Sequence, residues 1–308
     1  MTQRPFCSRL GAIFLFLWVS GCAGAPSPHP TRAKAMEQLT SAEELLMKNH
    51  PREALASVKN ALKMHQLSND YPSTIDDMNR LSRLSYLLGR GAAAKIWVDR
   101  ALVLEGVSDY PDRRAETLIL AAEMAPAGTE GPWISEAHRV IESLPKGSRT
   151  YTRLEARLYQ VEGIRASARK DYKGAVPLFK EALIRDLQLD DSLSIATDRA
   201  GIARNYYLSG AYETARKEFG EALKLDEKLR NHAGMAYDLE GISLAEAGLG
   251  HFRESARSMF AASGIESALG RTALAQRDIA FSRSLFRNIR TPDAAKFQNV
   301  LSHWFDPE

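Results

Sequence analysis

Small and larger apolar residues recur at helical spacing in six similar segments of the chain, mostly forty residues apart. In each segment a small residue is followed four positions later by a larger apolar residue, and three positions after that by a third residue. The positions hold Ala54, Ala94, Ala137, Ala175, Ala215 and Ser255; Val58, Val98, Ile141, Phe179, Phe219 and Met259; and Ala61, Ala101, Leu144, Ala182, Ala222 and Ala262. This spacing places all three on one face of a helix, and small residues there let a neighbouring helix approach closely.

A second helix is expected before each of these segments. A small residue lies twelve positions before the first small residue in five copies, where the chain has Ala42, Ser82, Gly163, Ala203 and Ser243. Between the two helices lie the turn residues Gly89, Gly91, Gly210 and Gly250. Glycine there ends a helix and permits a tight reversal. Each unit is therefore predicted to be an antiparallel helical hairpin, and the fixed period predicts an all-α solenoid whose hairpins bury their apolar faces against their neighbours.

An aromatic residue follows the turn in three of the units, as Tyr172, Tyr212 and Phe252, and the second helix has the pattern Ala-x-x-x-Phe-x-x-Ala. With these features the sequence resembles the tetratricopeptide repeat family. The resemblance implies a right-handed solenoid of about six hairpins with C-terminal capping helices, and a concave groove lined by the first helices. The family unit has about 34 residues, so the roughly six extra residues here predict hairpins about 9 Å longer in total helix. HEAT and armadillo repeats, which have about the observed period, are the competing architecture.

The N-terminal residues have the pattern of a secretion signal rather than of a repeat. Arg4 and Arg9 precede an apolar stretch at 11–19 that is too short to span a bilayer. This stretch runs into Val19-Ser20-Gly21-Cys22, which resembles the lipobox of bacterial lipoproteins. The resemblance implies cleavage before Cys22, diacylglycerol on its sulfur and acylation of its new amine. An ordinary secretory signal with an incidental cysteine is the alternative.

The expected division of the chain follows from these patterns. Residues 1–21 are the signal peptide, 22–35 are the lipidated cysteine and a Pro-rich tether, and 36–308 are the repeat domain. Ala23 follows the cysteine, and by resemblance to the Gram-negative sorting pattern the absence of Asp there indicates the outer membrane. The sequence thus predicts a cell-envelope protein, anchored by its lipid and facing the periplasm.

Composition and motifs argue against several classes of function. The chain has 41 basic and 38 acidic residues, and the first 21 residues hold two Arg and no acid, so 39 basic residues remain against 38. A nearly neutral chain does not suggest nucleic-acid binding, which needs clustered positive charge. No metal-binding, nucleophile or phosphate-loop motif occurs, and the seven His are scattered. We therefore expect no enzyme activity, catalytic residue, metal, cofactor or small-molecule substrate.

The candidate binding residues lie one and four positions after the small residue of the first helix. These positions hold Arg83 and Tyr86 in the second unit, and Arg204 and Tyr207 in the fifth, where Asn205 is adjacent. The family resemblance places them on the groove. An Arg and a Tyr at this spacing combine a bidentate anion donor with a stacking surface. The alternative is that the Arg stems pack on neighbouring Tyr rings and only solvate the groove.

Two further features leave alternatives open. The Pro- and Gly-containing stretch at 125–132 lengthens the turn of the third unit, either as a tolerated loop or as a specificity element. Near the C-terminus, Arg283, Arg287 and Arg290 fall on one side of an expected helix, as a basic surface for anionic groups or as a solvated face.

The functional hypothesis is a lipid-anchored envelope scaffold that binds another envelope protein or peptide through its concave groove, in the assembly of an envelope complex. Two alternatives stay open: an accessory subunit of an envelope enzyme or polysaccharide-export system, and a self-assembling structural lipoprotein.

Overall fold

The structure is a computed structural model that describes residues 30–47 and 50–288. These residues form thirteen α-helices and contain no strand. The helices are α1 (Pro30–Met47), α2 (Pro51–Leu67), α3 (Tyr71–Leu87), α4 (Gly91–Glu105), α5 (Pro111–Met124), α6 (Gly131–Glu142), α7 (Arg149–Ala168), α8 (Tyr172–Leu189), α9 (Ser192–Leu208), α10 (Tyr212–Leu229), α11 (His232–Gly248), α12 (Phe252–Ala268) and α13 (Thr272–Asn288). The predicted all-α fold is thereby confirmed.

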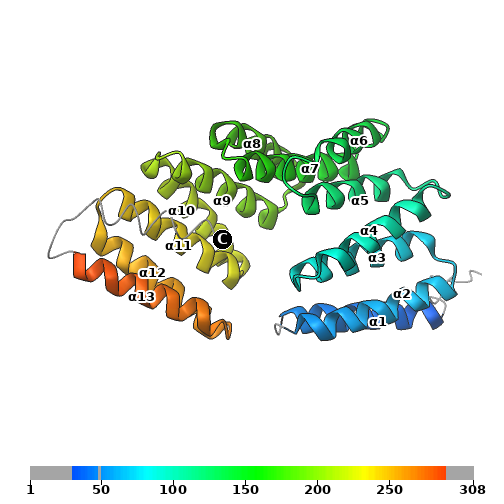
Figure 1. Ribbon diagram of the computed structural model, residues 1–308, viewed down its shortest axis with the longest axis horizontal. Helices are drawn as coiled ribbons and strands as arrows, with labels where there is room; N and C mark the ends of the chain where they lie inside the picture. The colour runs from blue at the N-terminus through cyan, green and yellow to red at the C-terminus, as the bar shows by residue number, and fades with distance from the viewer. Residues whose placement is uncertain (1–29, 48–49, 289–308) are drawn as a thin grey trace, which may run out of the picture.

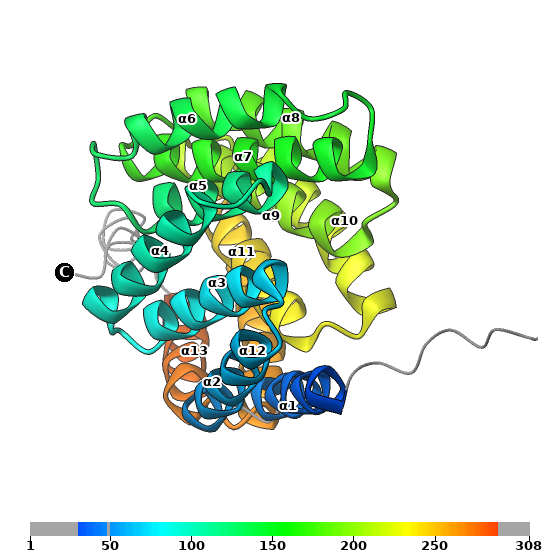
Figure 2. The ribbon, with the colours of Figure 1, turned by 90° about the vertical axis from the view of Figure 1, so that its right-hand side faces the viewer.

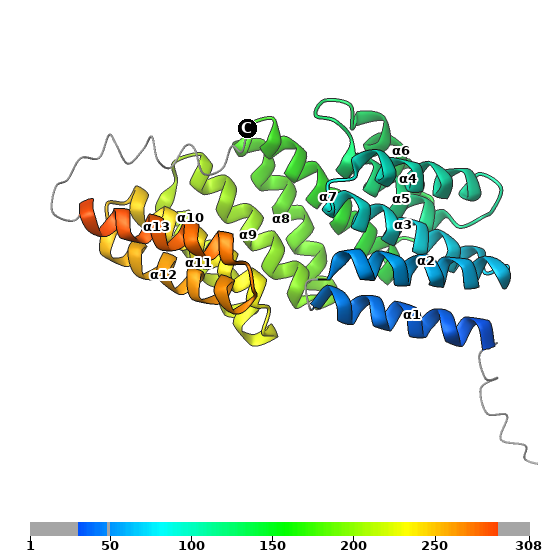
Figure 3. The ribbon, with the colours of Figure 1, turned by 60° about the horizontal axis from the view of Figure 1, so that its bottom comes forward.

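The helices form six hairpins, from α1–α2 to α11–α12, and α13 covers the last of them. Each first helix also contacts the first helix of the next hairpin along α3, α5, α7, α9 and α11. The hairpins build an open arch with these helices on its inner side, and α1–α2 and α12–α13 lie on opposite sides of the opening (Figure 1). Figure 2 shows the arch from its α1 side, and Figure 3 shows the helices following one another in chain order.

The domain boundaries differ in part from those expected. Helix α1 begins at Pro30, six residues before the expected start of the repeat domain at residue 36. Proline suits this place because the first turn of a helix needs no backbone N–H. Cys22 and the residues after 288, which would include the last of the expected C-terminal capping helices, lie outside the described residues.

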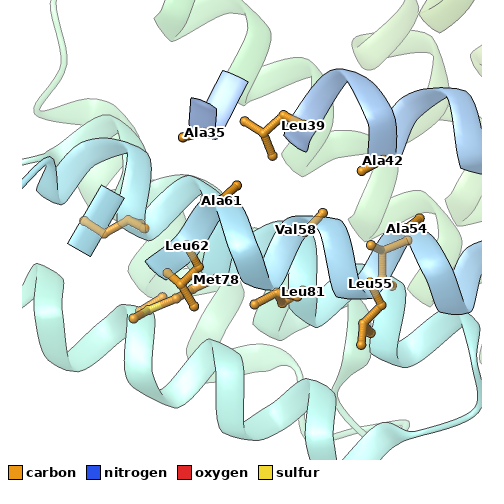
Figure 4. Packing of buried hydrophobic residues seen from close by; sticks show 13 residues of the cluster. Ala35, Leu39, Ala42, Ala54, Leu55, Val58, Ala61, Leu62, Met78 and Leu81 are labelled. Carbon is orange, nitrogen blue, oxygen red and sulfur yellow. The ribbon is translucent and has the colours of Figure 1, made fainter. Parts of the chain in front are cut away.

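The small residues predicted from the period form the contact between the two helices of each hairpin. Ala54, Ala94, Ala175 and Ala215 are fully buried, as is Ser255. Figure 4 shows the first hairpin, where Ala42 of α1 lies opposite Ala54 and Val58 of α2. Leu55 and Leu62 point from the other side of α2 toward Met78 and Leu81 of α3. The small residues therefore set the close approach within a hairpin, and larger residues fill the space between hairpins.

Aromatic residues at the larger position are accommodated by glycine. A Cβ atom added at Gly201 of α9 would lie 2.6 Å from the Phe179 ring, and one added at Gly163 of α7 would lie 2.9 Å from it. At Gly241 of α11 the added atom would lie 2.4 Å from the ring of Phe219. The two Phe side chains thus occupy the space that side chains at these glycines would need.

The turn glycines have the predicted role at three of four positions. Gly89, Gly210 and Gly250 follow α3, α9 and α11 with φ of 69°, 84° and 81°, in the left-handed region that glycine tolerates. Gly91 is instead the first residue of α4. In the fourth unit Lys170 takes the left-handed conformation, with φ of 64°.

The irregular third unit contains its extra residues in the loop between α5 and α6. Ala122 of α5 is fully buried at the small position, and Ala137 of α6 follows after fifteen residues instead of twelve, so the loop adds three. Arg165 of α7 donates to the Ala125 carbonyl oxygen, and Arg169 forms an ion pair with the buried Glu130. The loop is thereby held against α7.

Candidate functional site

A pocket of about 850 Å³ lies among the first helices α7, α9 and α11, which form the inner side of the arch. Its lining includes Ile164 of α7, Thr197, Arg204 and Asn205 of α9, and Tyr237 of α11. Ile164 and Tyr237 expose 50% and 40% of their surface. The pocket therefore offers apolar and aromatic surface beside a guanidinium and an amide, a combination common at sites of molecular recognition.

Three of the five predicted groove residues meet at this pocket, although they differ in exposure. The Arg204 side chain interacts with Tyr237. Asn205 is 1% exposed, and its Nδ2 donates to the Gly201 carbonyl oxygen at 2.8 Å. Its Oδ1 accepts no hydrogen bond within the described protein. A buried acceptor of this kind costs free energy unless a ligand or water donates to it.

Tyr207 also lines the pocket but belongs mainly to the core. It is 8% exposed, and its ring centroid lies 5.6 Å from that of Tyr212 at the start of α10. Little of this ring is available to a ligand, so the predicted stacking surface is largely covered.

The second-unit pair lies apart from the pocket, and neither of its residues lines it. Arg83 is partly buried on α3, and burial together with the nearby Arg157 lowers its pKa to about 10. Tyr86 is 50% exposed. The second unit has Gly91 where the fifth has Tyr212, so nothing comparable covers Tyr86. The structure therefore does not bring the two Arg–Tyr pairs into one site.

Ion pairs cross between first helices in the N-terminal half of the arch. Arg113 of α5 lies 3.5 Å from Asp76 of α3, and Arg153 of α7 lies 2.7 Å from Glu116 of α5. A further pair joins Arg157 to Glu123 at 3.5 Å. Several charged side chains of α3, α5 and α7 are thus already paired with one another within the protein.

Buried polar pairs at the junctions between hairpins were not anticipated from the sequence. The first member lies near the end of a second helix, and the other lies twelve residues later on the following first helix. The pairs are His65 and Asp77, Glu105 and Thr117, Asp186 and Asp198, Asp226 and Asp238, and Glu266 and Asp278, and every member is at most 4% exposed. These polar residues also recur at a spacing of mostly forty residues, which could have identified them. The repeat was recognised from small and apolar positions, which do not include them.

The basic surface expected near the C-terminus is only partly within the described residues. Arg283 is exposed on α13, whereas the side chain of Arg287 and all of Arg290 lie outside them. Within the described ranges, no three His, Cys, Asp or Glu residues are grouped as metal ligands would be. Nor does any described helix have the length and apolarity needed to cross a membrane.

No protein-family model matches the sequence, and no curated protein matches it. Among solved structures, BtubC (BKLC) from P. vanneervenii is similar, with 15% identity, a TM-score of 0.55, and coverage of 77% of this chain and 92% of that one. The STAND protein PH0952 from Pyrococcus horikoshii, which has a tetratricopeptide repeat sensor, is similar with 10% identity and a TM-score of 0.55. That match covers 87% of this chain but 44% of PH0952. At these identities the likeness concerns the fold alone: the chain is a solenoid of the tetratricopeptide-repeat type.

Proposed function

We propose that this chain is a non-enzymatic binding scaffold that holds a segment of a partner protein in the pocket among α7, α9 and α11. On this proposal Cys22 carries a lipid that confines the scaffold to the cell envelope, at the outer membrane facing the periplasm, and the partner is another envelope protein or peptide. The sequence around Cys22 supports the anchor.

One observation carries the binding proposal: the concave pocket has exposed apolar surface and a buried, unsatisfied amide oxygen on Asn205. A protein segment can supply both an apolar side chain and backbone N–H donors, so it matches what the pocket offers. The exposed Ile164 and Tyr237 would lose water contact when such a side chain enters, which favours binding.

A pair of isoleucines provides the test. Ile164 lines the pocket and is 50% exposed, while Ile184 of α8 is 48% exposed and does not line it. A photo-crosslinking amino acid at each position, activated in intact cells, should give a discrete adduct at 164 and none of that mass at 184. Equal adducts at both positions, or none at 164, would argue against the pocket as the binding site.

A blocking variant makes the test specific. Thr197→Arg places a long charged side chain in the pocket from an exposed position, and should abolish the adduct at 164. Leu193→Arg, one turn earlier on α9 and 52% exposed outside the pocket, should leave it unchanged. The anchor is tested separately, because Cys22→Ser should remove metabolic incorporation of labelled palmitate and release the protein from membranes.

A further inference from the structure

Two of the buried junction pairs consist of two aspartic acids each. Asp186 at the end of α8 pairs with Asp198 of α9, and Asp226 of α10 pairs with Asp238 of α11. The carboxyl groups of each pair interact with each other, and all four residues are at most 4% exposed. Asp198 Oδ2 and both carboxyl oxygens of Asp238 are buried and accept from no donor within the described residues. Two neighbouring carboxyl groups that are buried away from water cannot both be charged, so each pair must retain a proton.

The hydrogen-bond donors to these two pairs are neutral amides, as far as the described residues extend. At the first, Gln160 of α7 donates to Asp186 Oδ2 at 3.1 Å and to Asp198 Oδ1 at 2.8 Å, and Asp191 adds a further negative charge. At the second, Asn231 donates to Asp226 Oδ1 at 2.9 Å.

Tyr237, beside Asp238, turns toward Arg204 of α9. Both pairs are thus held by neutral amide donors, with no ion pair to either of them within the described residues.

The other junctions are neutralised in different ways. Arg80 lies 2.9 Å from Asp77, and His65 lies 2.7 Å from it. Arg271 and Arg277 form ion pairs with Glu266 and Asp278. At the junction between α4 and α5, the buried Glu105 accepts a hydrogen bond from the Thr117 hydroxyl at 2.6 Å. The Asp186–Asp198 and Asp226–Asp238 junctions differ from the others in that each brings two carboxyl groups together.

We propose that the Asp186–Asp198 and Asp226–Asp238 pairs form a pH-sensitive joint, which is closed by one retained proton at each pair and loosens α8–α9 and α10–α11 when those protons are lost. The joint adjoins the pocket, because Asp226 and Asp238 line it and α9 carries Arg204 and Asn205. Its effect on a ligand rests on the function proposed above, whereas its effect on helix packing does not.

The direction of the pH dependence follows from the retained protons. Burial raises the pKa of Asp198 and of Asp238 to about 8, and that of Asp186 to about 6, from 3.8. A group whose pKa is raised in the folded state contributes stability that is fully present below the unfolded value. That contribution declines as the pH rises and is lost once the pH passes the folded value. The sensitive window therefore runs from about pH 4 to about pH 8.

Hydrogen exchange measured by mass spectrometry on the full chain in detergent tests the joint without any ligand. After correction for intrinsic exchange rates, protection of α8–α11 should fall roughly tenfold per pH unit for each retained proton between pH 5 and pH 8, and level off above. Peptides of α2 and α3, whose junction contains Arg80, should show a smaller dependence. Equal protection of α8–α11 at pH 5 and pH 8 would overturn the proposal.

The variant Asp198→Asn with Asp238→Asn replaces the protonated carboxyls by neutral amides and should flatten the slope. Asp171→Asn is the matched control, since it changes an exposed helix-capping aspartate on α8 and should keep the wild-type slope. If the double variant does not fold, each single variant should flatten the slope at its own junction only. An unchanged slope in folded variants would contradict the proposal.

Crosslinking at Ile164 separates the joint from the proposed function. A wild-type adduct that weakens from pH 5.5 to pH 8, but stays constant in the double variant, supports both. A pH-dependent exchange pattern with no adduct at either pH supports the joint and overturns only the binding site.

Discussion

The contact between Gly241 and Phe219 gives the sharpest prediction about packing. An alanine Cβ at position 241 would lie 2.4 Å from Cζ and 2.5 Å from Cε1 of Phe219, whereas ordinary contact begins at 3.4 Å. Phe219 is 2% exposed, and the Tyr237 ring lies 6.2 Å away, so the ring has little room to move. Overpacking of this kind costs about 1–3 kcal/mol, against a gain of about 1 kcal/mol in helix propensity.

We therefore expect Gly241→Ala to lower the free energy of unfolding by up to about 2 kcal/mol, measured by urea titration at pH 6. Gly220→Ala is the control, because it also lies within a helix but its added Cβ would meet nothing within 4 Å. That change should raise the free energy of unfolding by roughly 0.5–1 kcal/mol through helix propensity alone. The two substitutions are chemically identical and should have opposite signs.

A second variant attributes the loss to the ring itself. In a Phe219→Leu background the clashing atoms are absent, so Gly241→Ala should cost less than it does in the wild type. A Gly241→Ala variant that is stabilised as Gly220→Ala is, or that loses the same free energy of unfolding in both backgrounds, would refute the predicted clash with the Phe219 ring.

Three further predictions concern other parts of the arch. Asp77→Ala should lower the free energy of unfolding by about 3 kcal/mol, because it removes the buried partner of His65; urea titration measures this, and an effect below 1 kcal/mol would contradict it. Arg169→Ala should raise proteolysis within 125–130, because it removes the ion pair that holds Glu130 against α7. It should change the free energy of unfolding by less than about 1 kcal/mol, because the Arg169 side chain is half exposed to solvent. Burial raises the pKa of Glu105 to about 7, so its contribution to stability is lost as the pH rises from about 4.5 through 7. Glu105→Gln should reduce this dependence in thermal unfolding followed by circular dichroism, and an unaltered pH profile would refute it.

Much of the fold could be predicted because close packing restricts residue size at fixed positions. Where two helices cross, a larger side chain would separate them, so the sequence carries a small residue at each crossing and repeats it. Ala54 and Ala215 are both fully buried for this reason, although 161 positions separate them. The start of α1 at Pro30 was missed because proline was taken as a mark of extended chain, while the first turn of a helix also accepts it.

The candidate site was less predictable because exposure depends on residues from other helices. Tyr86 and Tyr207 occupy the same place in their units, yet they are 50% and 8% exposed. The difference comes from residue 91 or 212 on the next helix, Gly in one unit and Tyr in the other. The position in the repeat predicts which face a side chain is on, but its neighbours decide whether a ligand can reach it.

One position of each first helix, six residues before its small residue, differs between the two halves of the arch. In α3 and α5 this position holds Asp76 and Glu116, each paired with an arginine on the next first helix. In α9 and α11 it holds Thr197 and Tyr237, and the Thr197 hydroxyl donates to the Leu193 carbonyl oxygen within its own helix.

The acidic side chains at this position of α3 and α5 thus bridge to the next first helix, and Arg157 at the same position of α7 pairs back with Glu123 of α5. The uncharged residues of α9 and α11 form no ion pair within the described residues. A Thr197→Glu substitution should not form a bridging ion pair to α11, because α11 contains no arginine that could face it. The pocket thus lies where the ion pairs at this position stop along the inner side of the arch.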